Sequence, residues 1–333
     1  MLETINAKAT KDTKVLLFLC VLCVLCVSHF VSPAASQSAS PTQVGSIKVP
    51  ADTLEVRGSH AYVAGGRTLT VLDISDPASP KKAGEYTFPE QIWSFRIVGS
   101  QVYVAANFFG LGILDISKPA SPVLRAAFKT PGQAKGVAVI GSTVFVADHM
   151  SGVDVVDITS PDKPVGRGSF FVDGYARDVA TSSKFGYAVD APTGLYVLDP
   201  SKPGTADAVG QLQSAAAPQM IEVLEHAGRV IACVVGGGSF QTYDVTVPEK
   251  PVALGTVKTP SGRPIRFTLQ GTRAYVADGR DGVQIVDLDN PSNPVIVGSI
   301  KTNAPARDVA LGGGLVLVAV GMGEGNEEVV VLR

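Results

Sequence analysis

The chain has 333 residues, of which 45% are hydrophobic and 17% are charged, and its formal net charge is −2. Together with 35 glycines and 22 prolines, this composition is typical of a globular, turn-rich protein and excludes a largely disordered chain. A nucleic-acid-binding protein shows a clear excess of Lys and Arg, so the charge balance argues against nucleic acid as a partner.

Residues 1–36 predict a secretory signal peptide. A polar start with three lysines precedes an uncharged apolar run over residues 15–27, and small residues follow around Ala35. That order is the pattern of a cleaved signal. The alternative is an uncleaved anchor over residues 15–31, although the apolar run is shorter than the about 20 residues of a spanning helix. Residues 37–43 are expected to form a disordered linker.

Cysteine use agrees with export. Three of the four cysteines, Cys20, Cys23 and Cys26, lie inside the apolar run, so we do not interpret their spacing as a metal motif. Cys233 is the remaining cysteine, which excludes an intrachain disulfide in the exported part. Burial of a hydrophobic core must therefore stabilise that part.

From residue 44 onward the sequence repeats itself about every 42 residues. The phrases LTVLDISDPASP, LGILDISKPASP, GVDVVDITSPDKP and GVQIVDLDNPSNP begin at residues 69, 111, 152 and 282. Each repeat holds four short apolar stretches rich in Val and Ile and bounded by Gly, Pro, Asn or Asp, which predicts strands. Four strands in a period of this length predict one blade of a β-propeller.

An aspartate ends the third predicted strand in the first six repeats. These residues are Asp73, Asp115, Asp157, Asp199, Asp244 and Asp287. A carboxylate at this place accepts N–H bonds from the following turn, and the prolines after it end the strand pairing. We therefore interpret this aspartate as a turn residue and not as a metal ligand.

The seventh repeat stops one strand short, at VVVLR. The missing outer strand has a counterpart at the other end, because VGSIKVP at 44–50 nearly copies VGSIKT at 297–302. The N-terminal strand is thus predicted to complete the last blade and to remove an open sheet edge. The fold class is all-β, a seven-bladed β-propeller of four-stranded antiparallel blades over residues 44–333.

The motifs IVDL, VVDI and LDIS, followed by P-x-x-P, resemble those of the LVIVD-repeat family of β-propeller proteins. The resemblance covers residues 44–333 and is weakest in the fifth repeat, where IACVVGGGSFQTYDVTVPEKP replaces the usual YVAD and LDIS. It implies an exported or surface-associated propeller, and it carries no catalytic residues.

The start of each inner strand supplies the candidate ligand site, because these positions meet at the mouth of the central channel. They are Asp52, Trp93, Lys135, Arg177, Gln219, Ile265 and Arg307. We expect Lys135, Arg177 and Arg307 to hold a carboxylate or phosphate through charge-assisted hydrogen bonds, with Trp93 and Tyr175 beside it.

The sequence leaves two alternatives open, one for the arginines of the mouth and one for a pair of phenylalanines. The pentapeptide ARDVA occurs twice, so Arg177 and Arg307 have the alternative of pairing with Asp178, Asp308 or residues of neighbouring blades. The pair Phe108–Phe109 in a predicted loop either packs into the core or offers an apolar contact to a partner.

No catalytic set is recognisable, and we expect neither a metal nor another cofactor. The histidines of the exported part lie in different repeats, and single aspartates before glycine turns, at 148, 190 and 278, supply too few ligands for Ca²⁺. Turn capping is the favoured interpretation of these three aspartates.

The sequence favours a non-catalytic secreted or cell-surface module that binds an envelope or extracellular protein or a small anionic ligand. Contact with a membrane is expected only through residues 15–31, if the signal is uncleaved. The alternative is a hydrolase or lactonase-like enzyme with a channel metal, for which Asp52, Glu55, Asp178 and Asp308 are the candidate acids.

Overall fold

The computed structural model describes residues 41–333 except 205–206, 214–216 and 324. The predicted signal peptide and residues 37–40 of the predicted linker lie outside the described residues. In the part that is described, no helix is long and apolar enough to cross a membrane.

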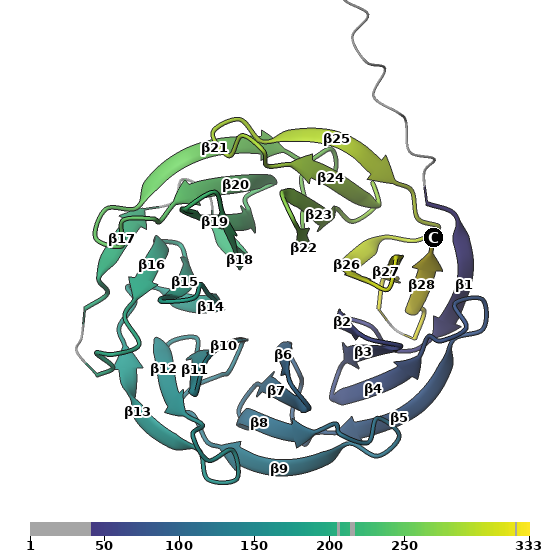
Figure 1. Ribbon diagram of the computed structural model, residues 1–333, viewed down its shortest axis with the longest axis horizontal. Coiled ribbons are helices and arrows are strands. Elements are labelled where there is room, and N and C mark those ends of the chain that lie inside the picture. Colours follow the sequence, from purple (N-terminus) through teal and green to yellow (C-terminus); the bar gives the residue numbers. More distant parts are fainter. Residues whose placement is uncertain (1–40, 205–206, 214–216, 324) are drawn as a thin grey trace, which may run out of the picture. The chain divides into compact units, whose positions relative to one another are not determined.

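Seven four-stranded antiparallel sheets surround a central axis, which confirms the predicted seven-bladed propeller (Figure 1). From the axis outward, the blades are β2 (Thr53–Arg57), β3 (His60–Gly65), β4 (Thr68–Asp73) and β5 (Lys81–Thr87); β6 (Ser94–Val98), β7 (Gln101–Ala106), β8 (Gly110–Asp115) and β9 (Val123–Phe128); β10 (Gly136–Ile140), β11 (Thr143–Ala147), β12 (Val153–Asp157) and β13 (Val165–Phe170); β14 (Tyr175–Thr181), β15 (Gly186–Ala191), β16 (Gly194–Leu198) and β17 (Gly210–Gln213); β18 (Pro218–His226), β19 (Arg229–Gly236), β20 (Ser239–Asp244) and β21 (Val252–Lys258); β22 (Arg266–Gln270), β23 (Arg273–Ala277), β24 (Val283–Asp287) and β25 (Val295–Ile300); and β26 (Ala306–Gly312), β27 (Leu315–Val320), β28 (Glu328–Leu332) and β1 (Gln43–Lys48).

Burial explains the apolar runs of the repeat. The second and third strands of a blade are covered on both faces by neighbouring blades, so they are apolar without alternation, as in β3 and β4. The outer strands face solvent on one side and alternate between half-buried and exposed positions, as in β25. The core therefore lies between the blades, in clusters that each draw residues from adjacent sheets.

Glycines in the outer strands let each blade contact the next one closely. A Cβ atom at Gly45 would lie 2.2 Å from the carbonyl oxygen of Pro77, and one at Gly84 would lie 2.5 Å from that of Pro119. Both prolines belong to the P-x-x-P turn that follows the third strand of the neighbouring blade. The turn motif thus has a second role, because the outer strand of one blade packs against it.

The predicted turn role of the repeated aspartate is confirmed in all six repeats. In each one a carboxylate oxygen accepts the backbone N–H two residues later, at 2.7–3.0 Å, from Ser75, Ser117, Thr159, Ser201, Thr246 or Asp289. Hydrogen bonds from Ser75 and Ser117 lower the pKa of Asp73 and Asp115 below the ordinary value. The charged carboxylate is therefore the form that holds the turn.

The predicted closure is also confirmed, since β1 pairs with β28 and the purple and yellow ends of the chain lie side by side in Figure 1. Reciprocal backbone hydrogen bonds of 2.9 and 3.0 Å join Thr42 and Arg333. The predicted linker is therefore too long at its end, because Thr42 and Gln43 already pair with the C-terminal strand. Val44, Ile47 and Val49 pack against the core of the last blade.

Removing β1 should open the ring. A chain that begins at residue 51 loses the pairing with β28 and the burial of three apolar side chains, so its melting temperature should fall by at least about 5 °C or the chain should aggregate. Thermal unfolding followed by circular dichroism measures this change. A chain that begins at residue 41 is the control and should melt as the intact protein does; equal melting of both truncations would contradict the closure.

Candidate functional site at the mouth of the central channel

A cavity of about 400 Å³ opens around the axis on one face of the propeller. All seven residues predicted at the start of the inner strands line it: Asp52, Trp93, Lys135, Arg177, Gln219, Ile265 and Arg307. His149, Asp178 and Arg266 also contribute to the lining. The repeat register therefore brings residues from all seven blades together, while their role in binding a ligand stays a prediction.

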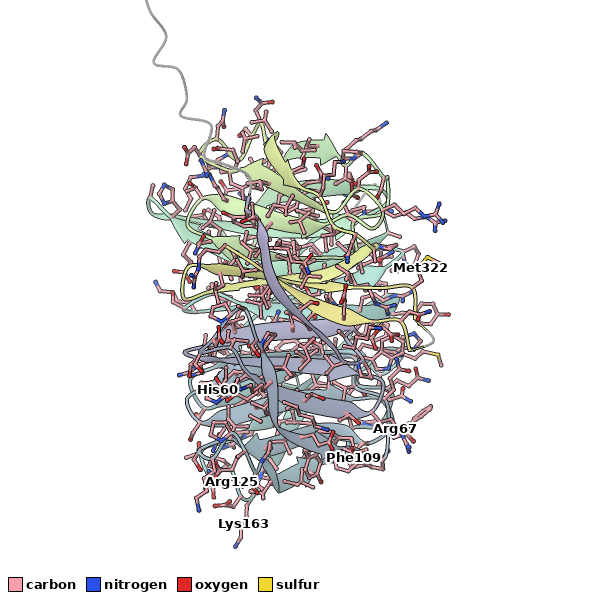
Figure 2. All side chains as sticks on the ribbon, turned by 90° about the vertical axis from the view of Figure 1, so that its right-hand side faces the viewer. His60, Arg67, Phe109, Arg125, Lys163 and Met322 are labelled. Atoms are coloured by element: carbon pink, nitrogen blue, oxygen red, sulfur yellow. The ribbon has the colours of Figure 1, made fainter. Side chains whose placement is uncertain are left out.

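The mouth face of the propeller is the face that carries this cavity and the loops between second and third strands. Seen edge-on, Arg67, Phe109 and Met322 lie toward this face, whereas His60 lies toward the opposite one (Figure 2). Of the two loop phenylalanines, Phe109 packs edge-on against Phe88 at 5.5 Å, and Phe108 stays half exposed. Phe109 therefore belongs to the core, and Phe108 belongs to the surface.

Three basic side chains crowd together on one side of the mouth. The Nζ atom of Lys135 lies 3.5 Å from the ring centroid of Trp93, a cation–π contact. Burial and then the charge of Arg177 lower the pKa of Lys135. Burial, followed by the charges of Lys135 and Arg177, lowers the pKa of His149. The like charges of Lys135 and Arg177 favour an anion in the adjoining cavity.

The two arginines of the ARDVA motifs differ in their partners. Arg307 forms an ion pair with Asp52 of the first blade, and Asp52 also accepts the N–H of Gly66 at 3.1 Å. Arg177 is exposed, and no ion pair or hydrogen bond involves its guanidinium among the described residues. The pairing alternative therefore holds for Arg307, with Asp52 as the partner, and does not hold for Arg177.

The aspartates of the same motifs serve a structural role. Asp178 accepts the N–H of Ile221 at 3.2 Å, and Asp308 accepts the N–H of Leu54 at 3.0 Å, each on the inner strand of the following blade. Burial raises the pKa of both carboxyl groups. These carboxylates therefore tie neighbouring blades together beneath the mouth.

Tyr175 was expected beside the anion at the mouth, but it lies behind His149 and does not line the cavity. Its ring stacks on His149 with centroids 4.8 Å apart and an interplanar angle of 19°. His149 forms part of the lining, so Tyr175 acts on the mouth through this histidine. His149 lies in the loop after β11, so a comparison of the inner-strand positions does not include it.

An ion-pair network crosses the channel below the mouth. Arg96 on β6 contacts Glu55 on β2 at 3.2 Å and Glu222 on β18 at 2.5 Å, and Glu55 also accepts the N–H of Ile97 at 3.1 Å. Arg266 reaches the carbonyl oxygen of Trp93 at 2.6 Å. The sequence comparison missed Arg96 and Glu222 because they lie three positions after the compared residues, Trp93 and Gln219.

One carboxyl group of this network, that of Glu55, has a pKa near neutrality. Burial raises the pKa of Glu55 from 4.5 to about 7, against the lowering effect of Arg96. Burial also raises the pKa of Glu222. Since Arg96 faces two carboxylates, protonation of one of them leaves a balanced pair.

Glu55 should make stability depend on pH. Its folded pKa exceeds the unfolded value, so its contribution to stability is present below pH 4.5 and is lost as the pH rises through 7. The melting temperature should therefore fall between pH 5 and 8, and Glu55→Gln should flatten this fall while keeping an acceptor for Ile97. The exposed Glu85→Gln is the control; identical pH profiles for wild type and Glu55→Gln would contradict the assignment.

All four acids proposed for the alternative enzyme have partners in the protein. Asp52 pairs with Arg307, Glu55 with Arg96, and Asp178 and Asp308 with backbone N–H groups. Among the described residues, no group of three or more His, Cys, Asp or Glu side chains is placed to hold a metal ion.

The aspartates before the glycine turns cap loops, as the sequence favoured. Asp148 accepts the hydroxyl of Thr130 at 2.7 Å, Asp190 the N–H of Gly174 at 2.6 Å, and Asp278 the N–H of Ser261 at 3.0 Å. Each bond joins the end of a second strand, or the residue directly after it, to the connection that enters the same blade.

Fold and site together define a closed β-propeller with a basic channel mouth. The family model described as LVIVD repeat matches residues 50–87, 92–130, 131–171, 173–210 and 267–302, more than half of the chain. The protein therefore belongs to the LVIVD-repeat family. No curated protein matches the chain significantly.

Solved structures share the fold at low sequence identity. BamB from Moraxella catarrhalis is similar with a TM-score of 0.55 and 14% identity, over 89% of this chain and 98% of BamB. Raptor from Chaetomium thermophilum is similar with a TM-score of 0.64 and 13% identity, over 88% of this chain and 29% of Raptor. The chain thus corresponds to less than a third of Raptor, and both likenesses concern the fold alone.

Proposed function

We propose that this propeller is an exported, non-catalytic binding module that takes an anionic group, a carboxylate or a phosphate, at its channel mouth. The observation that carries this proposal is that Lys135 and Arg177 both line a cavity of about 400 Å³, and that the guanidinium of Arg177 has no ion pair or hydrogen bond among the described residues. The anionic group belongs to a small ligand or to an envelope or extracellular protein.

The charge balance of the mouth supports an anion over a cation. Of the lining acids, Asp52 is neutralised by Arg307, and Asp178 is buried and bonded to Ile221. Lys135 and Arg177 stay available on the cavity wall. A hydrogen bond to a charged group contributes about 1.5–3 kcal/mol, so two such donors suffice for measurable binding of a small anion.

The same engagement of the acids supports binding over catalysis. A hydrolytic channel metal needs several free oxygen or nitrogen ligands that converge on one point. The four candidate acids instead hold arginines or backbone N–H groups of neighbouring blades. The rival enzyme would have to break these contacts to bind its metal.

Substitution of Arg177 should weaken the bound anion without unfolding the protein. Loss of one charged hydrogen bond weakens binding about tenfold or more, and Arg177 is exposed, so Arg177→Ala should melt close to wild type. Titration with phosphate and with succinate, followed by the fluorescence of Trp93, the single tryptophan of the chain, measures the affinity.

Arg273, the exposed first residue of β23, supplies the matched control, and Arg273→Ala should bind as wild type does. If no carboxylate or phosphate binds the wild type, or if Arg177→Ala lowers only the melting temperature, the anion-binding mouth is wrong.

Export rests on the sequence pattern of residues 1–36. N-terminal sequencing of the protein from its native host should find a start near residue 36, outside the cytoplasm. An intact N-terminus in the membrane fraction would indicate the anchored alternative. Intact protein in the cytoplasm would overturn both.

A further inference from the structure

A second hollow adjoins the channel mouth. It measures about 750 Å³ and lies on the mouth face over the sixth and seventh blades. Ile265 and Arg307 line this hollow and the mouth cavity alike, so the two share a wall. We call the second hollow the arginine groove, after Arg263, Arg280 and Arg307 in its lining.

The groove is basic in its own right. Arg263 precedes β22, Arg280 lies in the loop between β23 and β24, and both are exposed. Among the described residues, no ion pair or hydrogen bond involves either guanidinium. Asp281 is the acid in the lining, and no ion pair joins it to these arginines. Two cations thus face the groove beyond the charges of the mouth.

The loops that carry these arginines are held in place. The N–H of Arg263 donates to the hydroxyl of Ser261 at 3.0 Å, and that hydroxyl donates to Asp278 at 2.5 Å. On the other side, the N–H of Ala306 donates to the carbonyl oxygen of Gly279 at 2.8 Å. The backbone positions of both arginines are therefore fixed before a ligand arrives, which reduces the ordering cost of binding.

The size of the combined site excludes a single small anion as its full occupant. A lone phosphate or carboxylate fills a minor part of the mouth and reaches none of the groove. A ligand that uses both hollows must be extended and must carry several negative charges. The exposed apolar side chains of Trp93, Ile265 and Met322 lie among the basic ones, and they suit a chain that also carries apolar groups.

We propose that the ligand is an acidic peptide segment of a partner protein, bound extended from the channel mouth into the arginine groove. One side-chain carboxylate occupies the mouth beside Lys135 and Arg177, and a later one occupies the groove between Arg263 and Arg280. This inference rests on the proposed anion-binding mouth and adds the identity of its ligand.

The test compares two probes by titration calorimetry at fixed ionic strength. N-acetylglutamate amide carries one side-chain carboxylate and reports on the mouth alone, whereas an acetylated, amidated hexaglutamate reaches both hollows. The proteins are wild type, Arg177→Gln for the mouth, the double variant Arg263→Gln/Arg280→Gln for the groove, and Arg273→Gln as an exposed control on the same blade.

Hexaglutamate should bind wild type at least about tenfold more tightly than N-acetylglutamate amide, because it adds charged contacts in the groove. The double variant should lose this gain and keep the affinity for the single glutamate. Arg177→Gln should weaken both probes, and Arg273→Gln should weaken neither.

Other outcomes separate the two proposals. If the double variant binds hexaglutamate as wild type does while Arg177→Gln weakens both probes, the groove is wrong and the mouth stands. If the single glutamate fails to bind and hexaglutamate binds with loss only in the double variant, the proposed mouth is wrong. If oligogalacturonate of equal charge binds as tightly as hexaglutamate and with the same dependence on Arg263 and Arg280, the assignment to a peptide is overturned.

Discussion

Each blade of this propeller ends at the channel in an inner strand with an unpaired edge, and the N–H groups of that edge need acceptors. At three of the seven inner strands a carboxylate of the preceding blade supplies one: Asp308 accepts from Leu54, Glu55 from Ile97, and Asp178 from Ile221. A buried N–H group without an acceptor costs about 1–3 kcal/mol, so these bonds hold adjacent blades together at the place where they are narrowest. The charges inside the channel follow from this demand.

The acids near the channel are engaged with backbone N–H groups of neighbouring blades or with Arg96 and Arg307, so they do not neutralise every basic side chain near them. Below the mouth, Arg96 balances Glu55 and Glu222, and Arg266 reaches the backbone of Trp93. Lys135 and Arg177 lie one layer higher, where no carboxylate of the mouth pairs with them in the described chain. The basic mouth therefore arises from the same inner-edge bonds that stabilise the ring.

The residues that line the mouth were predicted mainly from the register of the repeat. Seven equivalent inner strands meet on one axis, so residues 52 to 307 at equivalent positions were expected around one cavity, and all seven line it. The contact of Arg96 with Glu222 was not predictable in this way. The two residues are 126 positions apart, and whether they meet depends on the width of the channel and on the length of their side chains. His149 was missed because it enters the mouth from a loop, to which the strand comparison does not apply.

The fifth blade shows which part of the repeat specifies the fold. The family model leaves the fifth blade unmatched, yet β18 to β21 form a four-stranded sheet and the turn bond from Thr246 to Asp244 is kept. The family motif lies in the third strand and its turn, at the outer part of a blade, whereas the residues that fill the channel begin the first strand. A ring of this design can alter the chemistry of its mouth while its blades stay the same, so the ligand must be argued from the mouth and not from the repeat.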